Sequence, residues 1–473
     1  MLKDDRERVD ITKVEDELTR RELLRRAGLG GVVLAYGGLG AKTAVAGAPK
    51  YRNRQLQNSL RIMQWSHFVP SYDRWFDNEY TKQWGQANDT EVTVDHVNLA
   101  ELPARAAAEV AARSGHDLFQ FLAPPAAFED RVLNLRDIHQ EVTRKVGKLS
   151  AVGRKSSYNP KTKKYFGFPD NYVPDPVHYR RDLWAPLGLA PNSWDNVRRA
   201  APRLKAMGRP VGIGMSNELD SNMALIALMQ CYGAYIQNKD HRVTINSKGT
   251  REALKVMREI YRRGMTDEVF AWTAASNNTG YLAGRLSMAL NAISIARTLE
   301  GPPWVTSPQN TDLMRNTWIA PIPRGSERLG LEHVMGVYVI WNFARNKRGA
   351  KKFLVDMQTR YTPHFQNSGF YNFPAWPGGV RGGFKAVRRA AARDKHRPLG
   401  KYTILTTIAQ KYTTNVGHPG FSNAAVDEVF NKFLIPQMFA EVARGERSPD
   451  EAARVYQRQI GQIFAKWRRR GKI

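Results

Sequence analysis

Residues that act in catalysis in other proteins are present in this chain, but not at the spacings that catalysis needs. None of the ten histidines begins an H-E-x-x-H sequence, which excludes the common zinc-hydrolase pattern. The run Gly214-Met215-Ser216-Asn217-Glu218 lacks the second glycine of a nucleophile elbow. No spacing fixes Asp170 and Asp175 as an acid/base pair. We therefore expect no catalytic site, no cofactor and no bound metal.

The charge balance is strongly basic. The 473 residues contain 72 Lys and Arg against 44 Asp and Glu, a formal net charge of +28. Such an excess is compatible with an anionic ligand, a nucleic acid or an unusual medium. The basic residues are scattered, with small clusters such as Arg388-Arg389, and no run interleaves them with aromatics. We expect no nucleic-acid partner. The single cysteine, Cys231, excludes an internal disulfide.

The N-terminus has the layout of a targeting segment. A paired-arginine run over Thr19–Arg25 precedes an apolar, glycine-rich stretch over Ala27–Ala41 and the small residues of Thr43–Ala48. It resembles the bacterial twin-arginine export signal. We predict that residues 1–46 are removed, leaving an exported, periplasmic and soluble protein without a lipid anchor. The alternative is a helical N-terminal arm with a chance arginine pair.

Strands and helices then alternate. Strands are predicted over residues 60–65, 91–97 and 117–121, with helices over 70–87 and from Asn98 to Gly115. Short links of this kind imply parallel strands, whose carboxyl ends share one edge of the sheet. That edge is the expected position of a ligand.

A proline-rich stretch, residues 169–176, divides the chain. Three prolines in eight residues predict an exposed, extended crossing between two lobes. Beyond it we predict strands over 177–179, 210–215 and 287–290, helices that begin at Ser193, Ser221 and Ser247, and returns to the first lobe. The last helix is predicted from the Ser448 cap, with Pro449 in its first turn.

Four segments carry a resemblance to a known family. They are His178–Trp184 with Ser193-Trp194-Asp195, Tyr281–Met288, Phe343–Leu354 and Arg447–Ala452. In order and spacing they are similar to motifs of the family 1 extracellular solute-binding proteins of bacterial ABC importers. Two departures are that Arg180 replaces the family's usual asparagine, and that Ala292-Ile293-Ser294 stands where many sugar binders have tryptophan.

The resemblance implies a two-lobe α/β fold of the periplasmic binding protein type II class. Each lobe would be a mostly parallel sheet flanked by helices, and extended crossings would act as hinges. We expect the first lobe to contain residues 47–170 and 333–372, and the second 171–332 and 373–473. The hinges would lie near 170–176, 333–336 and 371–374.

The implied function is capture of a small polar solute in the interlobe cleft, a sugar or oligosaccharide, followed by delivery to the membrane permease. The protein would be a monomer and not an enzyme. Alternatives are an exported basic protein that binds an anionic ligand or nucleic acid, or a secreted hydrolase.

Aromatic faces would contact sugar C–H groups while polar groups satisfy hydroxyls. The candidate ligand-binding residues are Trp65, His67, Phe68, Gln120, Phe121, Asp170, Asn171, Tyr172, Asn277, Asn278, Asn291, Ser294, Tyr371 and Trp376.

Overall fold

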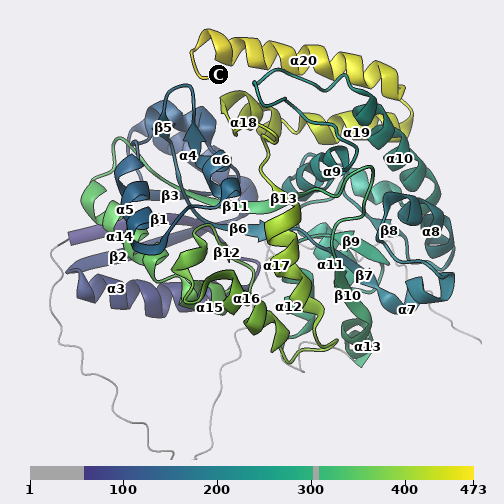
Figure 1. The fold of residues 1–473 in the computed structure, drawn as a ribbon, viewed down its shortest axis with the longest axis horizontal. Coiled ribbons are helices and arrows are strands. Elements are labelled where there is room, and N and C mark those ends of the chain that lie inside the picture. The colour runs from purple at the N-terminus through teal and green to yellow at the C-terminus, as the bar shows by residue number, and fades with distance from the viewer. Residues whose placement is uncertain (1–57, 302–307) are drawn as a thin grey trace, which may run out of the picture. The chain divides into compact units, whose positions relative to one another are not determined.

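A computed structural model describes residues 58–301 and 308–473, and these residues form two main sheets flanked by helices (Figure 1). The predicted export signal, residues 1–46, lies outside the described residues. Within the described ranges, no helix has the length and apolarity to cross a membrane.

The first sheet contains the three parallel strands that the sequence predicts. β1 (Asn58–Trp65) lies between β2 (Thr90–Val97) and β3 (Leu118–Phe121) and pairs in parallel with both. The chain therefore leaves β1 and β3 at the same edge of the sheet. The linking helical segments are α2 (Pro70–Trp75), a π-helical stretch (Phe76–Tyr80), α3 (Thr81–Ala87) and α4 (Leu102–Ala112).

The proline-rich stretch is a buried strand rather than an exposed crossing. Every residue of β6 (Phe168–Pro174) is buried, and β6 lies between β11 (Gly330–Ile340) and β12 (Phe373–Pro374), antiparallel to both. The prediction of exposure was wrong because the pairing with β11 has two register shifts. Where the register shifts, not every residue of β6 has to donate a backbone N–H, so prolines, which have none, can be accommodated.

The crossing to the second sheet is correspondingly short. Only Asp175 and Pro176 separate β6 from β7 (Val177–Arg180), the predicted strand that opens the second sheet. β11 runs antiparallel to both of its neighbours, β3 and β6. The first sheet is therefore mixed rather than mostly parallel.

The second sheet has the order β10-β7-β9-β8. β7 is antiparallel to both neighbours, and only β8 and β9 are parallel, so this sheet also departs from the predicted strand directions. β8 (Val211–Gly212) is shorter than predicted. The other elements are β9 (Met288–Leu290), β10 (Thr317–Ala320), α8 (Trp194–Ala206), α9 (Leu219–Cys231), α10 (Lys248–Gly264), α11 (Ser276–Leu282), α12 (Ser294–Leu299) and α13 (Pro308–Asn316).

Three of the predicted helix starts at serines are confirmed, whereas the helix predicted to begin at Ser221 begins at Leu219, with Glu218 as its cap. The hydroxyl oxygens of Ser193, Ser247 and Ser448 accept from the backbone N–H three residues further on, at distances of 3.1 Å each. The last helix, α20 (Pro449–Arg469), packs with α18 (Ala424–Asn431) and α19 (Leu434–Arg444) on the side of the second sheet (Figure 1).

Residues after 373 contribute first to the core of the first sheet. Trp376, Tyr402 and Ile408 all belong to that core, and the chain reaches the second core only after β13 (Thr413–Thr414), which pairs with β11. The lobe limits stay a prediction, and this packing favours a return near residue 413 rather than 373. The remaining helices are α5 (Arg136–Val146), α6 (Ala151–Ser157), α14 (Lys347–Thr359), α15 (Thr362–Asn367), α16 (Gly383–Ala392) and α17 (Leu405–Thr407).

The close packing of α10 on α8 generates a first prediction. A Cβ atom at Gly264 would lie 2.2 Å from the Cβ of Ala201, so Gly264→Ala should push the helices apart and lower the free energy of unfolding by about 1–3 kcal/mol. Gly461 in α20 has open space around it, so Gly461→Ala should instead stabilise by about 0.5–1 kcal/mol. Urea unfolding of both variants tests this, and destabilisation of equal size would contradict it.

Candidate functional site

Aromatic side chains gather where β1 ends. The ring of Trp65 lies 4.9 Å from that of His67, 5.3 Å from Phe68 and 6.3 Å from Tyr371. His67 and Tyr371 are also in contact, with ring centroids 4.8 Å apart. Four predicted site residues from two distant chain segments therefore form one aromatic cluster.

Hydrogen bonds decide which nitrogen of His67 carries the hydrogen, and burial decides its charge. Its Nδ1 accepts from the backbone N–H of Val69 at 2.9 Å, so Nε2 carries the hydrogen and donates to Asn372 Oδ1 at 3.1 Å. Burial lowers the pKa of His67 to about 4. The imidazole is therefore neutral near pH 7, and Asn372 is a site residue that the sequence did not single out.

Asp170 and Asn171 lie on β6, which pairs with β12, the strand that begins immediately after Asn372. The Asn171 amide donates to Asp170 Oδ2 at 2.7 Å. Burial raises the pKa of the Asp170 carboxyl to about 7, against hydrogen bonds from Asn171 and Gln120 that lower it. Three of the predicted residues are thus brought together around one buried carboxyl group.

The second sheet contributes a chain of amides. Asn277 donates to Asp220 Oδ2 at 2.7 Å, Asn291 donates to the side-chain oxygens of Asn277 and Asn278, and Asn278 donates to Ser294 Oγ at 3.0 Å. The Asn291 oxygen is buried without a hydrogen-bond partner among the described residues. All four predicted residues of this lobe therefore meet. Asp220, which accepts from Asn277, is a further residue of this group that the sequence analysis did not single out.

Tyr371 connects the two groups. It is fully buried, and its hydroxyl has no hydrogen-bond partner within the described ranges. Burial, and next the charges of Asp220 and Asp175, raise the pKa of the Tyr371 phenol well above its usual range. The charges of Asp220 on α9 and of Asp175 in the link between the sheets thus act on this phenol, and Arg297 of α12 donates to the Gly369 carbonyl two residues before it. We therefore take the junction of the two sheets as the candidate site.

Three predicted residues lie elsewhere. Trp376 stacks on Phe168 at 5.9 Å and donates from Nε1 to the Pro169 carbonyl. Phe121 packs among aromatic rings of the first core, and the Tyr172 hydroxyl donates to the Ala409 carbonyl. The structure does not bring Trp376, Phe121 and Tyr172 to the junction. The sequence could not separate them from site aromatics, because a core ring and a ligand-facing ring have the same residue type.

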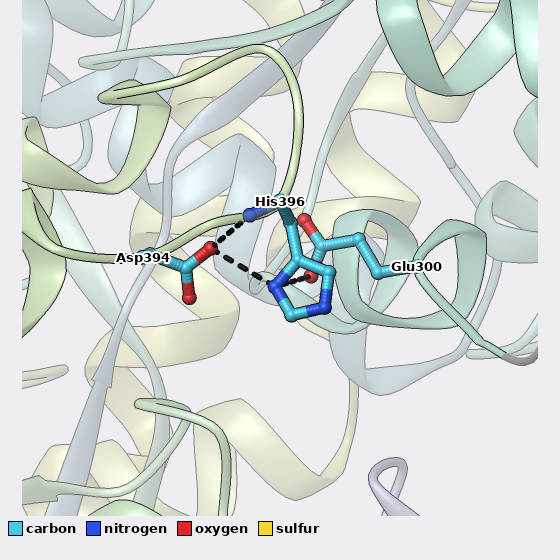
Figure 2. A group of neighbouring side chains, drawn as sticks. All are labelled: Glu300, Asp394 and His396. Atoms are coloured by element: carbon cyan, nitrogen blue, oxygen red, sulfur yellow. Dashed lines mark hydrogen bonds and ion pairs between the residues drawn. The ribbon is translucent and has the colours of Figure 1, made fainter.

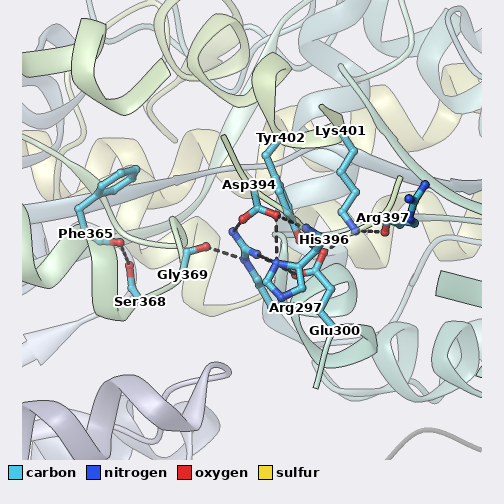
Figure 3. Close-up of polar contacts among 10 residues, drawn as sticks. All are labelled: Arg297, Glu300, Phe365, Ser368, Gly369, Asp394, His396, Arg397, Lys401 and Tyr402. Carbon is cyan, nitrogen blue, oxygen red and sulfur yellow. Dashed lines mark hydrogen bonds and ion pairs between the residues drawn. The ribbon is translucent and has the colours of Figure 1, made fainter. Parts of the chain in front are cut away.

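A charged cluster holds the turn that carries Tyr371 (Figure 3). The Arg297 guanidinium donates to Glu300 at 2.7 Å, to Asp394 at 3.0 Å and, from Nε, to the Gly369 carbonyl at 2.7 Å. It also lies 5.0 Å from the ring of Phe370. Phe370 has a φ of 70°, which is uncommon for a residue other than glycine. The contacts of Arg297 therefore stabilise a strained turn.

The same cluster contains three groups that could in principle hold a metal ion. Figure 2 shows His396 between Asp394 and Glu300, and their ligand atoms lie within 4.8 Å of one another. However, Glu300 also pairs with Lys401, and both carboxylates pair with Arg297. Two buried cations already neutralise the two carboxylates, so we interpret this as an ion-pair network and not as a metal centre.

The sequence of the chain matches a family model over residues 70–359, that of the bacterial extracellular solute-binding protein. This chain belongs to that family. Curated relatives of this solute-binding protein include a binding protein of Brucella abortus (strain 2308) and one of Brucella suis biovar 1 (strain 1330). Each is 24% identical over 218 residues, 44% of this chain and 50% of the relative. The solute-binding protein thus spans about half the length of the curated relatives it matches.

Solved structures show the fold of this solute-binding protein. An ABC transporter solute-binding protein from Thermotoga lettingae with bound alpha-D-tagatose is 14% identical, has a TM-score of 0.70 and covers 86% of this chain and 100% of its own. Maltose-bound MalE3 of T. maritima is 15% identical, with a TM-score of 0.69 and coverages of 86% and 99%. The GacH receptor of Streptomyces glaucescens is 15% identical, with a TM-score of 0.67 and coverages of 87% and 99%. These likenesses confirm the predicted two-lobe fold class.

The raised pKa of Asp170 generates a second prediction. Between about pH 4 and pH 7 the unfolded chain has lost this proton and the folded protein retains it, so folding stability falls as pH rises. Asp170→Asn removes this contribution. Its stability relative to wild type should therefore increase with pH, by at most about 1.4 kcal/mol per pH unit. Urea unfolding at several pH values measures the difference, and a constant difference over the range would contradict it.

The ion-pair network generates a third prediction. Arg297→Ala leaves two buried carboxylates without their shared cation and should lower the free energy of unfolding by about 3–5 kcal/mol. Arg198 provides a matched control, because it also bridges two carboxylates, Asp195 at 2.7 Å and Glu259 at 2.9 Å, but at the surface. Arg198→Ala should cost about 0–1 kcal/mol. Equal losses would show that burial does not decide the strength of the network.

Proposed function

We propose that this solute-binding protein captures a small polar solute, a sugar or oligosaccharide, at the junction of its two sheets. The observation that carries the proposal is that Tyr371 belongs to the aromatic cluster of the first sheet, while Asp220, which accepts from Asn277, is close enough to raise the pKa of the Tyr371 phenol. The solved structures support the ligand class, because three of them are of proteins bound to alpha-D-tagatose, maltose and acarbose.

The residue types at the junction match the chemistry of a sugar. Trp65 and Phe68 offer aromatic faces to C–H groups, while Asn278, Asn291 and Ser294 offer donors and acceptors to hydroxyls. A desolvated hydroxyl without a partner is costly, so a ligand of this class needs both kinds of surface. The oxygens of Tyr371 and Asn291, buried without a hydrogen-bond partner in the part of the chain that the structure describes, are the groups that a ligand hydroxyl would satisfy.

Ligand entry would require the two lobes to separate. The hinges predicted near 333–336 and 371–374 overlap β11 and β12 of the first sheet, so they do not join the two sheets. We assign the hinges instead to the segments that do: Asp175–Pro176, residues 321–329 and residues 415–423. The ligand would favour the closed form to the extent that both lobes contact it. We further propose that the protein is exported, acts as a monomer without catalysis, and delivers its ligand to the transmembrane subunits of an ABC importer.

A fourth prediction tests the site. Isothermal titration with a panel of monosaccharides, disaccharides and polyols should identify a ligand for the wild type. Tyr371→Phe and Asn291→Ala should each weaken its binding by about 1–3 kcal/mol, because a ligand hydroxyl loses its partner. Tyr281→Phe is the matched control, since Tyr281 is equally buried but lies in a separate small core.

Small-angle scattering provides an independent readout of the same prediction. The radius of gyration should fall when saturating ligand is added, because the lobes close around it. If the ligand bound Tyr371→Phe and Asn291→Ala as tightly as the wild type, the junction would be the wrong site.

A further inference from the structure

The surface around α8 contains a cavity of about 350 Å³, separate from the junction residues. Its lining is dominated by guanidinium groups and has two apolar side chains. The lining residues are Leu187, Leu189, Arg198, Arg199, Arg203 and Arg263.

Local structure explains why the arginines converge. Arg199 and Arg203 are one turn apart on α8, so they lie on the same face of that helix. Arg263 comes from the last turn of α10, which approaches α8 so closely that Gly264 leaves no room for a Cβ atom beside Ala201. The helix packing therefore places Arg263 beside the two arginines of α8.

The positive charge of the cavity is only partly neutralised. Arg198 pairs with Asp195 at 2.7 Å and with Glu259 at 2.9 Å. Arg199, Arg203 and Arg263 are exposed, and within the described ranges no ion pair or hydrogen bond engages their side chains. Three guanidinium groups therefore face one concave space without an acidic partner.

We propose that this cavity binds a small oxyanion with at least two negative charges, carried by phosphoryl or carboxylate groups. Guanidinium groups donate paired hydrogen bonds to both kinds of group, and several of them around one anion add their attraction. A volume of about 350 Å³ is at the lower end of small-molecule sites. Leu187 and Leu189 would contact an apolar part of the same ligand. The concave shape favours a small anion over a nucleic-acid backbone, which needs an extended basic surface.

The test uses the full chain and three probes: inorganic phosphate, pyrophosphate and tricarballylate, which carries three carboxylates and no phosphorus. Isothermal titration at low ionic strength should detect binding of pyrophosphate or tricarballylate, and inorganic phosphate should bind more weakly. The double variant Arg199→Gln/Arg203→Gln should weaken binding at least about tenfold, since two charge-assisted hydrogen-bond donors are lost. Preference between pyrophosphate and tricarballylate identifies the phosphoryl or the carboxylate source.

The control is a double variant that loses the same number of positive charges at a different helix. Arg388→Gln/Arg389→Gln removes two exposed arginines of α16 and should leave the affinity unchanged. Both double variants should unfold like wild type, because all four side chains are exposed. Failure of the wild type to bind any of the three probes would overturn the proposal, as would an equal loss in the control, which would indicate diffuse attraction to the net charge. These results are independent of sugar binding, which is measured at the junction.

Discussion

The pairing of β6 with β11 depends on a glycine. A Cβ atom at Gly336 would lie 2.5 Å from both Asp170 Oδ1 and Asn171 Nδ2, so any larger residue would displace the two polar side chains of β6. β11 also pairs with β3 and β13. This long strand thus joins three other strands, and the lack of a side chain at Gly336 leaves room for the buried carboxyl group of Asp170.

Burial sets the chemistry of the junction more than net charge does. The chain has a formal charge of +28, but Asp170 and Asp220 are acidic and buried, and the half-buried Glu218 caps α9, the helix that carries Asp220. Burial raises the pKa of Glu218 to about 8, with a further rise from the charge of Asp220. The arginines of α8 and α10, by contrast, are at the surface. The charge of the whole chain is therefore a poor guide to the ligand of the junction, and two surfaces of opposite character can serve two ligands.

The turn that carries Tyr371 is held by contacts from outside its own segment. Ser368 Oγ accepts from the Asn372 backbone N–H at 3.1 Å, and Arg297 of α12 donates to the Gly369 carbonyl. α12 itself begins at Ser294, one of the amide-linked residues of the junction. The ion-pair network therefore links the turn before Tyr371, which belongs to the aromatic cluster, to the helix that begins at Ser294, which belongs to the group of amides. Its contacts also compensate the unfavourable backbone conformation of Phe370.

The sequence by itself determined the local elements, because periodicity and caps act within a few residues: the parallel strands β1 to β3 and the helices that begin at Ser193, Ser247 and Ser448. It also placed Asn291 and Ser294 at a strand end, where polar groups after an apolar run mark an edge. Only the tertiary structure decided that residues 169–174 are buried, since register shifts on a partner far along the chain accommodate the prolines. Likewise, only packing distinguished Tyr371 at the junction from Trp376 in the core, because burial depends on which distant segments come to lie beside each ring.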